Sequence, residues 1–166
     1  MNAITIRHLT PKDWTSVSKI YAQGIATGLA TFETKVPSWE HWNEKYIQTC
    51  RIVALSEEKV VGFAVLSPVS TRKVYKGVAE VSVYVDQEHR GQHIGEILLR
   101  QLIKESEEHQ FWTLQAGIFS KNIASIALHE KCGFRIVGFR EKIGQLHGEW
   151  FDNHFLERRS KWVMNR

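Results

Sequence analysis

The residues with the clearest chemical potential lie in the stretch HRGQHIGEILL, residues 89–99. Gly91 and Gly95, together with the cation of Arg90, stand directly before leucine and isoleucine residues at helical spacing. A glycine turn that leads into a helix can present backbone N–H groups and the positive helix end to a phosphate. The stretch matches neither the Gly-Lys-Ser/Thr phosphate loop nor the G-x-G-x-x-G dinucleotide pattern. The spacing therefore indicates an anion site without identifying the anion.

The same stretch also permits a metal pair or an ordinary loop. His89 and His93 stand four residues apart, but this spacing crosses a turn, whereas a histidine pair at i and i+4 binds metal from one face of a helix. We therefore expect no metal site here.

A second candidate site lies on the strand predicted for residues 77–86. Alternation divides this strand into an apolar face with Ala79, Val81, Val83 and Val85, and a second face with Glu80, Ser82 and Tyr84. A carboxylate on a valine-rich strand costs free energy unless it is paired or faces a cleft, where it can act as a general base. The alternative is an edge strand with a solvated polar face. The adjoining glycine turn favours the cleft.

A third candidate site lies in NIASIALHEKCGF, residues 122–134. On a helix that begins at Asn122, the side chains of Asn122, Ser125 and His129 lie on one stripe, because they are three and four residues apart. This polar stripe is either the solvent face of the helix or part of a site.

The elements that must position these residues follow from hydrophobic periodicity. Helices are predicted over about 11–27, 38–48, 95–109 and 122–132, and strands over 51–56, 59–69, 77–86, 111–119, 134–143 and 149–162. We find no linker or internal repeat. The order predicts one α/β domain over residues 1–166, with a mixed, mostly antiparallel central sheet flanked by helices on both faces.

Composition limits the possible partners. The 166 residues are 43% hydrophobic and 24% charged, as in a globular domain, and no run approaches the ~20 apolar residues of a membrane span. The net charge of +4 permits an anionic ligand, but no basic cluster carries interleaved aromatic residues. We expect no nucleic-acid or membrane partner, a cytoplasmic location, and free thiols at Cys50 and Cys132.

The segments VSVYVDQEHRGQHIGEILL and NIASIALHEKCGF together resemble the Gcn5-related N-acetyltransferase (GNAT) superfamily, whose pattern after its fourth strand is Arg/Gln-x-x-Gly-x-Gly/Ala. TFET, RKVYKGVAEVSVYV, LHEKCGF and HGEW are similar to the phosphinothricin and methionine sulfoximine acetyltransferase branch. The resemblance covers nearly the whole chain. It implies a GNAT domain that uses acetyl-CoA to acetylate the α-amine of a small amino acid or analogue.

The resemblance also implies roles for individual residues. It implies that Glu80 is the catalytic glutamate and that His129 replaces the general-acid tyrosine of many superfamily members. The implied acetyl-CoA contacts are Val83, Tyr84 and Val85 through their backbone, the loop Arg90, Gly91, Gln92, His93, Ile94, Gly95 and Glu96, and Asn122 with Ser125. The implied substrate contacts are Phe32, Glu33, Arg72, Lys73, Val74 and Tyr75.

At His93 the chain departs from the superfamily pattern, because a histidine stands in place of the middle glycine. Its β-carbon can crowd a diphosphate, or its ring can donate a hydrogen bond to it. Arg72 and Tyr75, a few residues before Glu80, fit recognition of an acidic substrate group; the alternative for Arg72 is an ordinary exposed loop arginine. The branch implies a homodimer. Alternative functions are a protein N-terminal or lysine acetyltransferase and a non-catalytic acyl-CoA-binding domain.

Overall fold

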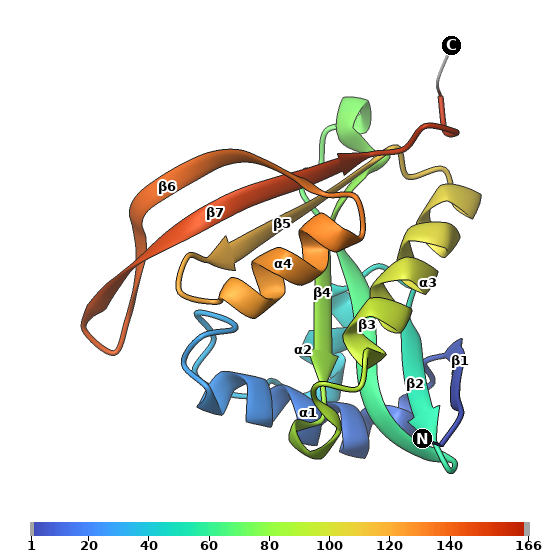
Figure 1. Cartoon of the computed structure of the whole chain (residues 1–166). Coiled ribbons are helices and arrows are strands. Elements are labelled where there is room, and N and C mark those ends of the chain that lie inside the picture. Colours follow the sequence, from blue (N-terminus) through green and yellow to red (C-terminus); the bar gives the residue numbers. More distant parts are fainter. Residues whose placement is uncertain (1, 165–166) are drawn as a thin grey trace.

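A twisted seven-stranded sheet runs through the computed structural model, which describes residues 2–164 (Figure 1). The strand order is β1-β2-β3-β4-β5-β7-β6. Neighbouring strands are antiparallel except for β4 and β5, which are parallel. The strands are β1 (Ile4–His8), β2 (Ile52–Ser56), β3 (Lys59–Pro68), β4 (Val78–Val85), β5 (Thr113–Phe119), β6 (Arg135–Leu146) and β7 (Glu149–Arg159).

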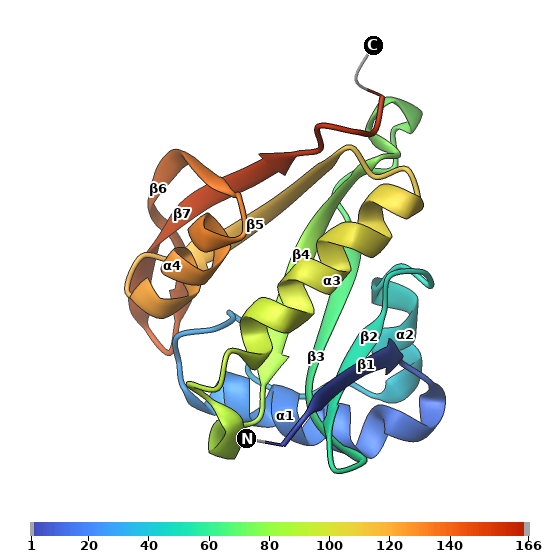
Figure 2. The same ribbon diagram turned by 45° about the vertical axis from the view of Figure 1, so that its right-hand side comes forward.

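Four α-helices cover the two faces of this sheet (Figure 2). They are α1 (Trp14–Ala26), α2 (Trp39–Lys45), α3 (Ile94–Glu108) and α4 (Ile123–Lys131), and short 3-10 helices cover Pro11–Asp13, Lys73–Tyr75 and Gln87–His89. On one face, α3 buries Leu98 and Leu102 against Ala64 and Val81. On the other face, aromatic residues of α1 and α2 pack with Phe63. The predicted α/β fold with helices on both faces is confirmed.

Two elements differ most from the sequence prediction. Strand β1 was not predicted, because it is a five-residue edge strand with two isoleucines, too short for a clear alternating pattern. Helix α2 ends at Lys45 rather than near residue 48. The buried guanidinium of Arg51 donates hydrogen bonds to the carbonyl oxygens of Asn43, Tyr46 and Ile47, and these bonds fix the end of the helix.

Strands β4 and β5 pair only over a short stretch and then diverge (Figures 1 and 2). Their register joins Val78 to Thr113, Ala79 to Leu114 and Glu80 to Gln115, whereas β4 continues to Val85 alongside β3. Beyond Glu80, the backbone groups of β4 that point toward β5 have no partner strand within residues 2–164. The gap between β4 and β5 is therefore a place where a ligand can bind to the β4 backbone.

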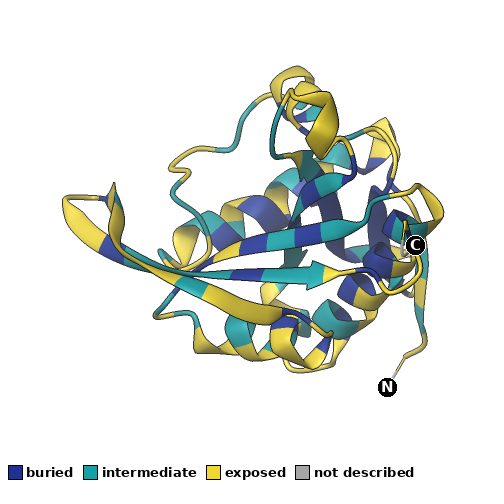
Figure 3. Cartoon of the chain, turned by 90° about the horizontal axis from the view of Figure 1, so that it is seen from above, coloured by how far each residue is buried: buried dark blue, intermediate teal, exposed yellow. Residues whose placement is uncertain are grey.

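The β6–β7 hairpin extends from the body of the domain, and most of β6 is exposed (Figure 3).

Among residues 2–164, no helix is long and apolar enough to cross a membrane.

Candidate active site

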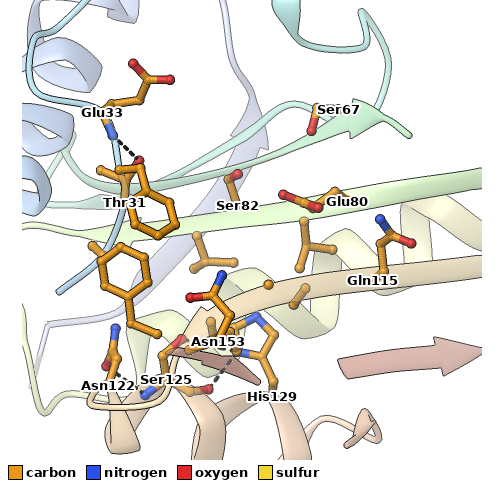
Figure 4. Close-up of a pocket in the computed structure, with 18 of the residues that line it drawn as sticks. Thr31, Glu33, Ser67, Glu80, Ser82, Gln115, Asn122, Ser125, His129 and Asn153 are labelled. Atoms are coloured by element: carbon orange, nitrogen blue, oxygen red, sulfur yellow. Dashed lines mark hydrogen bonds between the residues drawn. The ribbon is translucent and has the colours of Figure 1, made fainter. Parts of the chain in front are cut away.

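Glu80 lies at the last paired position of β4, where β4 and β5 begin to diverge. It is half-buried and has Ser67 of β3 and Gln115 of β5 as its register neighbours. Its side chain points toward the cavity shown in Figure 4, on the face opposite Ala79 and Val81. The predicted alternation along this strand is confirmed, and the structure places the carboxylate at the wall of a cavity.

This first cavity has a volume of about 480 Å³, in the range of small-molecule sites. Phe32 and Glu33 line it, as expected from the sequence, and the Phe32 ring packs 4.5 Å from that of Phe119. Tyr21 and Tyr46 line the cavity as well, and burial raises the pKa of each phenol to about 12. Both phenols are therefore protonated near neutral pH and can donate hydrogen bonds.

Helix α4 brings the predicted polar stripe to the cavity. Asn122 caps the helix, because its side-chain oxygen accepts a hydrogen bond from the Ser125 N–H at 3.2 Å. The His129 ring is only 5% exposed, and its Nδ1 lies 2.7 Å from the Ser125 carbonyl oxygen. A carbonyl oxygen can only accept, so Nδ1 carries the proton and Nε2 carries a lone pair. Burial lowers the pKa of His129, although the bond to Ser125 opposes this. The imidazole is therefore neutral near pH 7.

A second cavity, of about 520 Å³, lies between the glycine turn and α4. Its walls include His89, Arg90, Gly91 and the start of α3, residues 93–96. His93 has a φ of 61°, in the left-handed region, so its β-carbon is accommodated at a conformational cost.

The wall of the second cavity also carries an ion-pair cluster. The Glu96 carboxylate pairs with Lys131 at 2.6 Å and with Arg100 at 2.9 Å, and these cations lower its pKa. Lys131 lines the cavity and supplies a second cation in addition to Arg90.

The two cavities meet at a shared wall. Val83, Asn122, Ser125 and His129 line both of them. A ligand in the second cavity and a ligand in the first therefore approach each other at β4 and the His129 ring, with Glu80 on the first-cavity side. This arrangement suits a transfer reaction between two bound molecules.

Some residues suggested by the sequence lie elsewhere. Gln92 lines neither cavity, and Tyr84, which was expected to contact acetyl-CoA through its backbone, lines the first cavity and not the second. Arg72, Lys73, Val74 and Tyr75 are exposed and line neither cavity, and the Arg72 guanidinium lies 5.6 Å from the centre of the Tyr75 ring.

Several residues that line the cavities were not predicted from the sequence. Gln115, Arg140 and Asn153 line the first cavity and Lys131 lines the second. Asn153 carried a usable signal, because asparagine is depleted inside strands, and it lies in a predicted one. Arg140 carried none, because an arginine on an edge strand is ordinary.

Both cysteines lie away from the two cavities. Cys50 and Cys132 are buried free thiols outside both cavities, and burial raises the pKa of each. Within residues 2–164, no group of three or more histidine, cysteine, aspartate or glutamate side chains is arranged to hold a metal ion.

Known acetyltransferases are similar in sequence to this protein over most of its length. The sequence model of the acetyltransferase (GNAT) family matches residues 14–134. A phosphinothricin N-acetyltransferase of Alcaligenes faecalis is 30% identical over 162 residues, which cover 94% of this chain and 82% of that protein. An L-methionine sulfoximine/L-methionine sulfone acetyltransferase of Salmonella typhimurium is 29% identical over 159 residues, which cover 93% of each protein.

Solved structures share the fold. A ribosomal-protein-alanine N-acetyltransferase from Brucella melitensis has a TM-score of 0.87 at 34% identity and covers 94% of this chain and 99% of that one. A phosphinothricin acetyltransferase (Pat) from Sinorhizobium meliloti was solved with acetyl-CoA. It has a TM-score of 0.88 at 30% identity, and the match covers 98% of this chain and 92% of that one. The predicted family resemblance and the predicted use of acetyl-CoA are thus confirmed. The chain belongs to the GNAT family of acetyl-CoA-dependent N-acetyltransferases.

Proposed function

We propose that the protein transfers the acetyl group of acetyl-CoA to the α-amine of a small amino acid or analogue, of the phosphinothricin, methionine sulfoximine or methionine sulfone type. The observation that carries this proposal is the meeting of two cavities at the His129 ring, with Glu80 on the wall of the first. The reaction is a direct attack of the amine on the thioester while both substrates are bound.

In this proposal the second cavity binds acetyl-CoA. The cations of Arg90 and Lys131 and the N–H groups at the start of α3 fit a diphosphate. The backbone of Val83 and Val85 faces the gap between β4 and β5 and fits the amide groups of the pantetheine arm. A free N–H of β4 near Val83 can also polarise the thioester carbonyl, as in an oxyanion hole.

Glu80 is proposed as the general base, acting directly or through a water molecule. The amine arrives as an ammonium and must lose a proton before its lone pair can attack. The ordinary pKa is about 8 for an α-amine and about 10.4 for a lysine amine, so this deprotonation costs roughly 1.4 to 5 kcal/mol at pH 7. A positioned base contributes on the order of 10²–10⁴ in rate.

His129 is proposed as the group that handles the second proton. The Nε2 lone pair takes a proton from the nitrogen of the tetrahedral intermediate and delivers it to the departing thiolate of coenzyme A. A neutral imidazole suits this shuttle, and its Nδ1–H bond to the Ser125 carbonyl holds the ring in place.

The first cavity, with a volume of about 480 Å³, has the size of a small-molecule site. Phe32 and Glu33 line it, and Glu33 forms an ion pair with Lys45, which lines it as well. A protein N-terminal or lysine acetyltransferase needs an open groove that admits a peptide. The small volume of the first cavity therefore favours a free amino acid over a protein substrate.

Release of free thiol from acetyl-CoA tests the proposal. We expect wild-type protein to accelerate release with phosphinothricin, methionine sulfoximine or methionine sulfone, but not with the N-acetylated form of the same compound. Glu80→Gln is expected to lower kcat about 100-fold while leaving acetyl-CoA affinity unchanged.

Two results would count against the proposal. Acceleration by no amine, in protein that still binds acetyl-CoA, removes the proposed activity. Glu80→Gln that keeps more than about a tenth of the wild-type kcat removes only the general-base role.

We also propose that the protein is a homodimer. Strand β6 is a sheet edge and carries the exposed apolar residues Ile136, Val137 and Phe139, with Trp150 exposed on β7. Large apolar surface on an edge strand is typical of a protein contact. Light scattering during size-exclusion chromatography should give twice the mass of one chain, and Phe139→Glu should shift it toward one.

A further inference from the structure

The first cavity contains a cation that the proton-transfer scheme leaves unused. Lys45 and Arg140 are the lysine and arginine residues on its wall, and Lys45 already faces Glu33 at 3.9 Å. The Arg140 guanidinium instead lies 4.5 Å from the centre of the Phe155 ring. Across residues 2–164, no carboxylate forms an ion pair with Arg140. The cavity therefore offers an arginine held by an aromatic ring and available to an anion.

Asn153 lies directly opposite this arginine. In the β6–β7 ladder Arg140 pairs with Asn153, and residues directly opposite on antiparallel strands present their side chains on the same face. Both residues line the first cavity. In Figure 4 the side chains of Asn153, Glu80 and His129 line the same cavity. The Asn153 side-chain oxygen is buried and has no hydrogen-bond partner in the described part of the chain.

A local irregularity in β6 follows Arg140 directly. The register shifts between Arg140 and Gly144, so β6 carries extra residues there relative to β7. Lys142 has a φ of 45°, and its N–H donates to the Asp152 carboxylate at 2.7 Å. A bulge of this kind re-aims side chains near active sites, and here both Arg140 and Ile143 line the cavity.

We infer that Arg140 and Asn153 recognise the α-carboxylate and the α-amine of a free amino acid, an inference that rests on the proposed function. The guanidinium binds the carboxylate by paired N–H donors, and the Asn153 side-chain oxygen accepts a hydrogen bond from the amine. The carboxylate and the amine are attached to the same carbon of the substrate. Arg140 and Asn153 are likewise neighbours, because they lie opposite each other on the ladder.

This pair also gives a basis for selectivity. In a peptide, the α-carboxylate of the N-terminal residue is replaced by a neutral amide, so the Arg140 cation would lose its anionic partner. Arg72, the arginine expected from the sequence to bind an acidic group, lines neither cavity. Arg140 is thus a specificity-determining residue for a free amino acid over a peptide N-terminus.

The test compares two substrates that differ only in the carboxylate, L-methionine sulfone and its carboxamide. For Arg140→Gln we expect kcat/KM to fall about 10- to 100-fold with the sulfone and less than about threefold with the carboxamide, because the lost bond joins two charged groups. Taking the variant-to-wild-type ratio for each substrate removes the difference in amine basicity between them. Acetyl-CoA affinity should remain at the wild-type value, which also reports that the variant is folded.

Three further variants sharpen the assignment. Arg135→Gln removes an equal charge from the same strand, where Arg135 pairs with Glu157, and should leave both substrates unaffected. Asn153→Asp places an anion opposite Arg140 and should lower kcat/KM at least about tenfold for the sulfone only. Asn153→Ala removes the acceptor for the amine, so both substrates should lose activity.

The outcomes separate this inference from the proposed function. If Arg140→Gln lowers kcat/KM equally for both substrates, or if Arg135→Gln has the same selective effect, the carboxylate contact is overturned and the proposed function stands. If wild-type protein acetylates neither substrate nor any other amino acid, the proposed function fails and this inference fails with it.

Discussion

At the scale of single residues, His129 controls the expected pH dependence. Burial lowers the pKa of its imidazole below the ordinary value of 6.5. The ring therefore stays neutral until the pH falls below 6.5. The proposed proton shuttle requires the neutral form. The acidic limb of kcat/KM should therefore lie below pH 6.5 and should be absent from the residual activity of His129→Gln. A limb at pH 7 or above that is unchanged in the variant would contradict this role.

His93 is the residue at which the proposed cofactor site departs from the superfamily pattern. Its left-handed backbone costs a non-glycine residue roughly 1–2 kcal/mol, and its side chain forms part of the second cavity. We expect His93→Gly to lower the Kd for acetyl-CoA about two- to fivefold, which corresponds to at most about 1 kcal/mol. Isothermal titration calorimetry measures this directly.

Gln92→Gly is the matched control for His93, because Gln92 lines neither cavity and has no positive φ. It should leave the Kd unchanged. Weaker binding by His93→Gly would show instead that the ring donates a hydrogen bond to the cofactor.

At the scale of elements, an ion pair with a buried carboxylate joins β1 to the start of α1. The Asp13 carboxylate accepts hydrogen bonds from two Arg7 nitrogens at 2.8 Å and from the Thr10 N–H at 2.8 Å. Asp13→Asn should lower the free energy of unfolding by about 2 kcal/mol, because a hydrogen-bonded charge is lost from a buried position. Urea unfolding at pH 7 measures this.

The pH dependence of this pair has a defined sign. Arg7 lowers the pKa of Asp13 in the folded protein, so the stabilisation is present above the unfolded pKa near 3.9 and is lost as the pH falls through the folded value. Glu157→Gln breaks the exposed pair with Arg135 and should cost less than about 1 kcal/mol. Equal losses in the two variants would show that the Asp13 pair is no stronger than a surface pair.

Hydrophobic periodicity predicted most elements and, through them, the positions of Glu80, Asn122, Ser125 and His129, because one strand face and one helix stripe place these side chains. Three features depended on tertiary structure instead. The edge strand β1 is short, the divergence of β4 from β5 leaves no local pattern, and the β6 bulge changes the alternation near Arg140. The family resemblance of the RKVY segment therefore suggested Arg72, whereas the structure places Arg140 at the cavity.

At the scale of the whole molecule, the two cavities meet where β4 and α4 line both of them. The second cavity, proposed to bind acetyl-CoA, is lined by β4, the glycine turn, α3 and α4. The first cavity, proposed to bind the amine, is lined by the loop around Phe32, β5 and the β6–β7 hairpin, among other elements. The hairpin carries exposed apolar residues and also lines part of the first cavity. A dimer contact through this hairpin would therefore affect the shape of the substrate site.

The most direct test of the central claim is a competition for acetyl groups. Wild-type protein is incubated with acetyl-CoA, L-methionine sulfone and a peptide with a free N-terminus at equal concentrations, and the acetylated products are measured by mass spectrometry. The two-cavity site predicts that N-acetyl methionine sulfone accumulates at least about tenfold faster than acetylated peptide, as expected from the loss of one charge-assisted contact. Acetylation of the peptide alone would contradict the account.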